Sequence, residues 1–332
     1  FKQKTAYEIR LSLVGSEMCI RDRVFPFGGE NGLMEDLLAI FVTYNSAGYI
    51  GRAVESCLRQ GLSVLVVDNG STDGTVGEIP ADRRVRVVRS DKNLGFAGGV
   101  NRAVRESGET YLLLLNPDIE LLGAIDPMVT AVVQYGHSAA TGLLVDVAGT
   151  PQKGFSFRRL PTPTALVFEV LGINRIWPGN PVNRWYRCLD LDVLWAQEVE
   201  QPAGACFLFR RVDWERLGGF DEEFYPVWFE DVDFCQRLAK LGATIWFTPS
   251  VRVLHHGGHS VQKIDVGCRQ RVWYGSLLRY AAKHFRPFSR RFVAVTVAAA
   301  VVPRILIGRN GEQIRSKLSA IKFIWRMARK CL

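Results

Sequence analysis

The chain has 332 residues, of which 48% are hydrophobic, 11% aromatic and 23% charged, and it carries a net charge of +9. This balance excludes disordered, collagen-like and low-complexity proteins, and the length allows one large α/β domain or two smaller ones. Seven scattered cysteines without a Cys-x-x-Cys pair argue against a disulfide framework and a zinc knuckle, so we expect a reducing compartment.

The first 33 residues are expected to lie outside the fold. Residues 1–23 have weak periodicity and lack the long apolar core and small-residue cleavage site of a signal peptide. This stretch is similar to a translated adapter tail, so we treat residues 1–33 as a disordered or artefactual leader. Folding is predicted to begin near Met34.

Beyond Met34, short apolar runs alternate with segments of helical periodicity. Strands are predicted at four of these runs: residues 37–43, 63–68, 85–89 and 111–116. Helices are predicted between them at 47–60 and 98–107. Apolar strands that alternate with helices indicate a mainly parallel sheet covered on both faces, in which ligands bind beyond the carboxyl ends of the strands.

Polar clusters follow these strands, and each has a functional and a structural interpretation. In VVDNGSTDGT, Asp68 suits a nucleobase or a ribose, but the same pattern forms Asx-turns. Gly95 and Gly98 precede a helix and allow a phosphate to approach the backbone, or they are ordinary turn glycines. In NPD, Asp118 lies at the sheet rim, where it suits Mg²⁺ with Asn116 as a further oxygen contact, or caps a helix.

The second half of the chain begins with an aromatic-rich stretch. Residues 151–200 contain many aromatics, Pro and Arg without a regular period, so we expect an irregular insertion over the site. A strand is predicted at 204–211 and a helix at 228–241, followed by two separate short strands. Glu230 and Asp231 open this helix among aromatic side chains, which favours a general base, although the helix dipole alone explains acidic residues there.

Other polar residues of this region have simpler interpretations. Asp233 and Arg237 are four residues apart, which predicts an ordinary ion pair along the helix and leaves Glu230 or Asp231 as the catalytic candidate. The segment VLHHGGHS places three histidines within five residues beside glycines. This pattern is typical of a metal or phosphate site, or of structural histidines, and it is not the HExxH pattern of zinc proteases.

The last part of the chain carries the positive charge. From residue 261 onward, 16 Lys and Arg stand against 2 Asp and Glu. Residues 292–302 within it are apolar, flanked by Arg on both sides, and too short to span a membrane. This pattern favours a helix that lies on an anionic membrane surface, with a buried core helix and a solvated face as alternatives. We therefore expect a basic helical extension at the membrane surface over residues 263–332.

Eight motifs follow one another along the chain: TYNS, VVDNGSTDGT, NLGFAGGVN, NPD, GACFLFRR, GGFDEEF, FEDVDFC and HHGGHS. In this order they resemble the family-2 inverting glycosyltransferases of the GT-A nucleotide-diphospho-sugar transferase fold, in particular the rhamnosyltransferase-like enzymes of bacterial cell-envelope polysaccharides. The likeness covers residues 37–260. It implies an α/β fold with a mainly parallel central sheet flanked by helices and a C-terminal helical extension. The implied transferase domain spans 34–262, with a nucleotide-binding half (34–120) and an acceptor and catalytic half (121–262).

The resemblance also implies roles for individual residues. Nucleotide-sugar binding is implied for eight of them: Thr43, Tyr44, Asn45, Asp68, Asn93, Gly95, Gly98 and Asn116. Asp118 corresponds to a ligand of Mg²⁺ or Mn²⁺, although Asn replaces the first acid of the family's Asp-x-Asp motif. His255 would complete the metal or diphosphate shell, with His256 as the alternative. Glu230 and Asp231 match the family's Glu-Asp pair, whose Asp is the general base.

The implied reaction is a single in-line displacement at the cytoplasmic face of the cell membrane. Such an enzyme moves a sugar, here L-rhamnose from dTDP-rhamnose, to a hydroxyl of a glycan or a polyprenyl-diphosphate-linked acceptor. A nucleotidyltransferase of sugar phosphates is one alternative, although TYNSAGYIGR is a poor match to its Gly-rich basic loop. A nucleotide- or nucleic-acid-binding module is another, but the basic and aromatic residues form no known recognition unit, so no nucleic-acid partner is expected.

Overall fold

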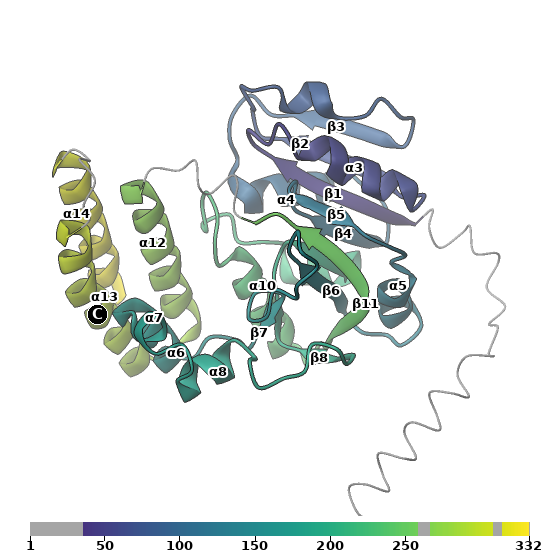
Figure 1. Cartoon of the computed structure of the whole chain (residues 1–332). Coiled ribbons are helices and arrows are strands. Elements are labelled where there is room, and N and C mark those ends of the chain that lie inside the picture. The colour runs from purple at the N-terminus through teal and green to yellow at the C-terminus, as the bar shows by residue number, and fades with distance from the viewer. Residues whose placement is uncertain (1–35, 258–265, 308–313, 332) are drawn as a thin grey trace, which may run out of the picture. The chain divides into compact units, whose positions relative to one another are not determined.

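The described part of the computed structural model comprises residues 36–257, 266–307 and 314–331. The predicted leader over 1–33 and the last three residues of the HHGGHS motif lie outside the described residues. From residue 35 onward the chain forms one unit, with a mixed sheet at its centre (Figure 1). The predicted division of this unit at 262/263 stays a prediction.

One half of the nine-stranded sheet is parallel. It contains four adjacent strands in the order β3 (Val85–Arg89), β2 (Ser63–Asp68), β1 (Leu37–Thr43) and β4 (Tyr111–Leu115). β1 is buried along its whole length, as are most residues of β2 and β4. The first three strands have the predicted bounds, and β4 ends one residue early, just before Asn116 and Pro117.

The other half of the sheet mixes directions. β10 (Cys206–Arg210) runs antiparallel between β4 and β6 (Ala139–Val145), and β6 pairs in parallel with β11 (Ile245–His255). β5 (Ile119–Leu121) and β8 (Gln197–Val199) are both antiparallel to β11. This arrangement brings the end of β11 beside β5, and therefore His255 opposite Ile119, close to the predicted metal ligand in the preceding turn.

One expectation about the strands was wrong in detail. The two short strands predicted after residue 242 are one strand, β11, because a register shift between Thr248 and Arg252 accommodates Pro249 without ending it. β3 has the predicted bounds. It lies at the edge of the sheet, where Val87 is 40% exposed.

Helices cover both faces of the sheet, as predicted. α4 (Gly95–Arg105), α9 (Arg211–Leu217) and α10 (Glu230–Lys240) share one apolar core with the even-numbered residues of β1. α3 (Ile50–Arg59) and α5 (Asp126–Val133) pack on the other face, against β2 and β6 respectively. A short 3₁₀ turn, η1 (Thr75–Glu78), follows β2 and contacts α3.

Residues 151–200 are more regular than the sequence suggested. They contain three helices, α6 (Pro163–Leu171), α7 (Ile173–Ile176) and α8 (Pro181–Tyr186), and two short strands, β8 and β7 (Phe157–Arg158), of which β7 pairs with β9 (Gln201–Pro202). The expectation of an irregular insertion was therefore wrong. The sequence nevertheless contains a signal for two of these helices. α6 and α8 each begin with Pro after a capping residue, Thr162 or Asn180, whose side chain accepts a hydrogen bond from a backbone N–H.

Three helices follow the sheet: α12 (Val266–His284), α13 (Pro287–Ile307) and α14 (Ile314–Cys331). They pack against one another, and α13 also packs against α6. The predicted apolar segment 292–302 lies within α13, where Val293 and Val297 are fully buried but Phe288 and Phe292 are 84% and 53% exposed. The buried-core alternative therefore describes one face of α13, and another face of the same helix is exposed. No helix among the described residues is long and apolar enough to cross a membrane.

A buried ion cluster joins α12 to α10. Asp233 Oδ2 accepts a hydrogen bond from Arg237 Nε at 2.8 Å, as the sequence predicted. Its Oδ1 lies 2.8 Å from Lys283 Nζ and 2.7 Å from His284 Nε2, both at the end of α12. Burial opposes ionisation of Asp233, but the hydrogen bonds from His284 and Lys283 outweigh it and lower its pKa to about 2. The cluster therefore fixes α12 to the helix that begins with the catalytic candidates.

Candidate active site

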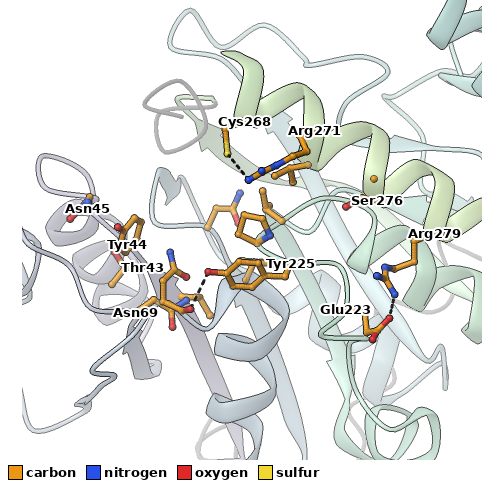
Figure 2. A pocket seen from close by; sticks show the side chains of 18 of the residues that line it. Thr43, Tyr44, Asn45, Asn69, Glu223, Tyr225, Cys268, Arg271, Ser276 and Arg279 are labelled. Atoms are coloured by element: carbon orange, nitrogen blue, oxygen red, sulfur yellow. Dashed lines mark hydrogen bonds and ion pairs between the residues drawn. The ribbon is translucent and has the colours of Figure 1, made fainter. Parts of the chain in front are cut away.

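Two adjoining cavities lie at the carboxyl ends of the strands. The first has a volume of about 920 Å³ and the second about 680 Å³. Phe96, Asn116 and Val227 line both, so the cavities meet at the turn that follows β4. In the first cavity, residues from the ends of β1 and β2 face residues of α12 (Figure 2).

The sheet wall of the first cavity presents unpaired polar atoms. Thr43 and Asn69 are buried at the ends of β1 and β2, and both line the cavity. Thr43 Oγ1 and Asn69 Oδ1 have no hydrogen-bond partner in the described chain. A buried polar atom without a partner costs free energy, so these two oxygens indicate a ligand that donates hydrogen bonds here. Asn69 was not among the predicted site residues, although it directly follows the end of β2.

Four more of the predicted residues line the same cavity. Tyr44 is 43% exposed, and Asn45 adopts a left-handed backbone conformation with φ of +52°. Asn45 Oδ1 accepts a hydrogen bond from Thr72 N at 2.9 Å, which joins the β1 and β2 loops. Asn93 Oδ1 accepts from the backbone at the start of α4 at 2.8 Å, and Asn116 lies at the junction of the two cavities.

Three of the described residues that were predicted to bind the nucleotide, Asp68, Gly95 and Gly98, line neither of the two cavities. They lie behind the polar wall of the first cavity. The Asp68 carboxylate is fully buried and accepts a hydrogen bond from Ser71 N at 3.3 Å, which is the Asx-turn alternative. Gly95 has a φ of +75°, and a Cβ there would lie 2.8 Å from Tyr225 Cδ2. A Cβ at Gly98 would lie 3.1 Å from Leu94 Cβ, so Gly98 relieves crowding within the start of α4, whereas Gly95 lets this end of the helix approach Tyr225. Their contact with a nucleotide stays a prediction.

The predicted metal ligands lie next to each other. Asp118 follows β4 and lines the first cavity, whereas His255 ends β11 and lines the second. The distance between Asp118 Oδ1 and His255 Nε2 is 3.9 Å. His256 points elsewhere, with its Nε2 3.3 Å from Glu120 Oε1. Of the two histidines that the sequence left open, the structure therefore brings His255 to Asp118.

The His255 ring is held by Gln152, a residue that the sequence did not indicate. Gln152 Nε2 donates to the backbone oxygen of His255 at 2.9 Å, so its Oε1 is left to face His255 Nδ1, also at 2.9 Å. The Nδ1 proton then points to Gln152, and the Nε2 lone pair faces Asp118. Burial lowers the pKa of His255 and outweighs the opposing charge of Asp118, which keeps the ring neutral. Phe155 stacks on it at 5.0 Å.

This pair of side chains fits a divalent cation that is bound mostly by its substrate. A carboxylate oxygen and an imidazole lone pair face each other across 3.9 Å, with the Asn116 amide nearby in the same turn. No cluster of three His, Cys, Asp or Glu residues suited to a metal occurs in the described part of the chain. Mg²⁺ and Mn²⁺ tolerate such an incomplete set, because waters and phosphate oxygens supply the other ligands.

The second cavity contains the two carboxyl groups at the start of α10. Asp231 Oδ2 accepts hydrogen bonds from Gly204 N at 3.1 Å and from Gln201 Nε2 at 3.4 Å. Its Oδ1 accepts from Val232 N at 2.8 Å. Burial raises the pKa of Asp231, and these backbone donors and the nearby charge of Arg158 oppose the rise. No ion pair of Asp231 is found among the described residues, and Asp231 lines the second cavity.

Glu230 differs from its neighbour. It is buried, and its Oε2 has no hydrogen-bond partner in the described chain. Burial, followed by the charge of Asp231, raises its pKa well above the ordinary value, which favours the neutral acid. The two preceding residues, Trp228 and Phe229, have φ values of +80° and +72°, so backbone strain is concentrated where α10 begins.

Aromatic and basic side chains complete the second cavity. Phe155, Tyr186, Trp228 and Trp273 line it together with Arg158. Flat aromatic faces and an arginine are surfaces on which a sugar ring can stack and form hydrogen bonds. Phe155 and Tyr186 come from the stretch 151–200, so this insertion lies over the site, as predicted.

Comparison with known proteins identifies the family. Residues 39–215 match the model of glycosyl transferase family 2. The chain is 33% identical over 246 residues to the N-acetylglucosaminyl-diphospho-decaprenol L-rhamnosyltransferase of Mycobacterium tuberculosis, covering 68% of this chain and 78% of that one. It is 26% identical over 223 residues to the rhamnosyltransferase WbbL of Escherichia coli K12, covering 65% and 71%.

Solved structures support the fold. The crystal structure of S. aureus TarS 1-349 in complex with UDP-GlcNAc matches with a TM-score of 0.52 and 14% identity, covering 88% of this chain and 81% of that chain. The structure of GalNAc-T7 with UDP, GalNAc and Mn²⁺ also gives a TM-score of 0.52, at 13% identity, covering 87% and 56%. The predicted GT-A fold is thus confirmed, and the chain belongs to glycosyl transferase family 2, within which it is similar to rhamnosyltransferases.

Proposed function

We propose that this chain is an inverting, metal-dependent glycosyltransferase that moves L-rhamnose from dTDP-rhamnose to a hydroxyl of a lipid-linked glycan in cell-envelope polysaccharide synthesis. The observation that carries the proposal is the meeting of two cavities at Asn116, one with Asp118 and the other with Asp231. The names of the mycobacterial and E. coli relatives support rhamnose as the sugar. The mycobacterial name also supports a diphospho-polyprenol as the acceptor carrier.

The first cavity is the proposed donor site. The unpaired oxygens of Thr43 and Asn69 suit the N–H groups of a nucleobase or the hydroxyls of a ribose. Tyr44, Asn45 and Asn93 extend this polar wall. Asp68, Gly95 and Gly98 would act from behind it by holding the loops that present these side chains.

Asp118 and His255 would hold the divalent cation, with Asn116 beside them. When bound, such a cation neutralises the charge that develops on the departing nucleoside diphosphate. The protein's part is to fix the two ligands before the donor arrives. Gln152 does so for His255, because its two hydrogen bonds leave the Nε2 lone pair directed towards Asp118.

Asp231 is the proposed general base. It takes the proton of an acceptor hydroxyl while that oxygen attacks the anomeric carbon, and the bond from this carbon to the diphosphate oxygen breaks with inversion of configuration. Within the Glu230–Asp231 pair the neutral form of Glu230 leaves Asp231 as the carboxyl that can act as the base, whereas the neighbouring Asp233 is already engaged by Arg237, Lys283 and His284. The acceptor sugar would lie against the aromatic walls of the second cavity.

The acceptor also determines where the enzyme works. A polyprenyl-diphosphate carrier is embedded in the membrane, so we place the enzyme on the cytoplasmic face of the cell membrane as a peripheral protein. The exposed Phe288, Phe292 and Val295 on one face of α13 support this placement, because they repeat at helical spacing and lie near Arg290 and Arg291.

A donor screen tests the proposed function. The full chain is incubated with Mg²⁺ or Mn²⁺, a polyprenyl-diphosphate-linked sugar, and dTDP-rhamnose, UDP-sugars or GDP-sugars in parallel. Release of dTDP with formation of a β-configured product from an α-configured donor, or the reverse, is the expected result. Incubation with a nucleoside triphosphate and a sugar 1-phosphate is the control, and pyrophosphate release there without transfer in the screen would support the nucleotidyltransferase alternative.

A further inference from the structure

The first cavity has a second wall that lies outside the residues matched by the family model. This wall comes from α12 and α14 and contains Arg271, Gly275, Ser276, Arg279 and Phe323. Figure 2 shows Arg271, Ser276 and Arg279 on the side of the cavity opposite Thr43, Tyr44 and Asn69, with Tyr225 between the two sides. The cavity that contains the donor-site residues is therefore completed by the C-terminal helices.

The two arginines of this wall differ in their partners. Arg279 forms an ion pair with Glu223, so its charge is compensated. Arg271 Nη2 lies 4.0 Å from Cys268 Sγ, and its guanidinium lies 5.7 Å from the centroid of the Phe323 ring. No carboxylate pairs with Arg271 in the described part of the chain. Among the described residues that line the first cavity, Arg271 is therefore the cationic side chain whose charge is not balanced by a carboxylate.

The contact between α12 and α14 sets the position of Arg271. A Cβ at Gly275 would lie 3.1 Å from Phe323 Cε1, so the absence of a side chain lets the Phe323 ring approach α12. Gly275 is one helical turn beyond Arg271, and the ring beneath the guanidinium attracts it through a cation–π interaction. Arg271 is therefore directed by its surroundings without being neutralised by them.

We propose that Arg271 binds a diphosphate group in the first cavity. This inference rests on the proposed function, which brings two diphosphates to the enzyme, one in the nucleotide-sugar and one in the lipid carrier. Guanidinium is suited to such a group because its planar donors form paired hydrogen bonds with phosphate oxygens. The donor diphosphate is favoured, because Thr43, Asn69 and Asn93 line the same cavity.

Binding measurements on the full chain test Arg271. Calorimetry compares dTDP with thymidine, and farnesyl diphosphate with farnesol, for the native chain, Arg271→Ala, Arg271→Lys and Arg269→Ala. Arg269 is the matched control, since it lies on α12 but does not line the cavity. Loss of a charge-assisted hydrogen bond predicts that Arg271→Ala weakens one diphosphate ligand about 10- to 100-fold and leaves thymidine and farnesol within about 3-fold.

The pattern of losses separates the outcomes. A loss confined to dTDP assigns Arg271 to the donor, and a loss confined to farnesyl diphosphate assigns it to the lipid carrier. Partial recovery of diphosphate affinity in Arg271→Lys supports either assignment, because Lys keeps the positive charge but cannot form the paired hydrogen bonds of a guanidinium. Unchanged binding of both diphosphates by Arg271→Ala, or an equal loss for the alcohols, overturns the inference. Failure of the native chain to bind any nucleoside diphosphate would instead overturn the proposed function.

Discussion

The carboxyl groups of Glu230 and Asp231, adjacent at the start of α10, differ in their hydrogen-bond partners. Asp231 accepts hydrogen bonds from two backbone N–H groups and a glutamine side chain, whereas Glu230 has a buried oxygen without a partner. Backbone donors stabilise the ionised form, and unrelieved burial stabilises the neutral form. The geometry therefore supports the proposal that Asp231 is the base and Glu230 its neutral neighbour, an assignment that the family resemblance implied and that the residue types alone left open.

The variant Asp231→Asn tests this distinction. We expect its turnover to fall by a factor of about 10²–10⁴, because an amide cannot accept the proton of the acceptor hydroxyl. Binding of dTDP, measured by calorimetry, should stay within about 3-fold of the native value, since Asp231 does not line the first cavity. Glu230→Gln is the matched control, and it should retain far more activity because the native side chain is already neutral. Near-native turnover of Asp231→Asn would contradict the base assignment.

Gln152 is a positioning residue that no local pattern indicated. It lies 103 residues from His255 in sequence, and only the pairing of distant segments brings the two together. Asp118 and His255 could be predicted because each belongs to a motif, and their approach follows from the pairing of β5 with β11. A single glutamine in a loop has no such signature, so its role becomes visible only through its two hydrogen bonds.

Gln152→Ala should weaken the cation site without removing a ligand. The His255 ring would lose the acceptor for its Nδ1 proton, and outer hydrogen bonds of this kind contribute about 10- to 100-fold to metal affinity or activity. The Mn²⁺ affinity measured by calorimetry should fall, and the Mn²⁺ concentration that gives half-maximal turnover should rise. Turnover at saturating Mn²⁺ should lie closer to the native value. Gln134→Ala, an exposed glutamine at the end of α5, is the control. Unchanged Mn²⁺ affinity in Gln152→Ala would refute the positioning role.

At the level of elements, buried strands were the easiest to predict and short helices the hardest. β1 and β2 have their predicted bounds, because strands covered on both faces are continuous apolar runs that end where polar residues begin. α7 and α8 have four and six residues, too few for a helical period to appear. The contact between α12 and α10 could not be predicted either, since it depends on partners about 50 residues apart.

The variant Asp233→Asn tests how much this contact between α12 and α10 contributes to the free energy of unfolding. Removing one partner of a buried ion cluster costs about 3–5 kcal/mol, so the free energy of unfolding in urea should fall by that order. Glu215→Gln is the control. Its ion pair with Arg211 is on the surface, where the Glu215 side chain is 63% exposed, so removing it should cost less than about 1 kcal/mol.

The pH dependence of the same cluster has a defined sign. The pKa of Asp233 is about 2 in the folded chain and about 3.9 in an unfolded one, so the folded state favours the ionised carboxylate. Its contribution to stability is therefore complete above about pH 4 and is lost as the pH falls from about 4 to 2. Asp233→Asn should flatten the stability profile in this window. An identical acid slope in native and variant chains would contradict the cluster's role.

For the whole molecule, each candidate cavity is built from segments that no single motif contains. The first cavity joins residues of β1 and β2 to residues of α12 and α14, and the second joins the 151–200 insertion to α10 and β11. The C-terminal helices thus have two surfaces, one that completes a cavity and one, on α13, that presents apolar side chains to solvent. We expect the second surface to hold the enzyme against the membrane, as the proposed lipid-linked acceptor requires.

A double variant, Phe288→Ser with Phe292→Ser, tests the membrane surface of α13. Burial of a Phe side chain contributes about 1.5–3 kcal/mol, so losing two should reduce partition into vesicles more than 10-fold. Co-sedimentation with phosphatidylglycerol–phosphatidylcholine vesicles measures this, and added salt should weaken native binding because arginines flank the stripe. Val147→Ser with Leu194→Ser removes two other strongly exposed apolar side chains and should bind like the native chain. Equal sedimentation of both double variants would mean that α13 does not contact the bilayer.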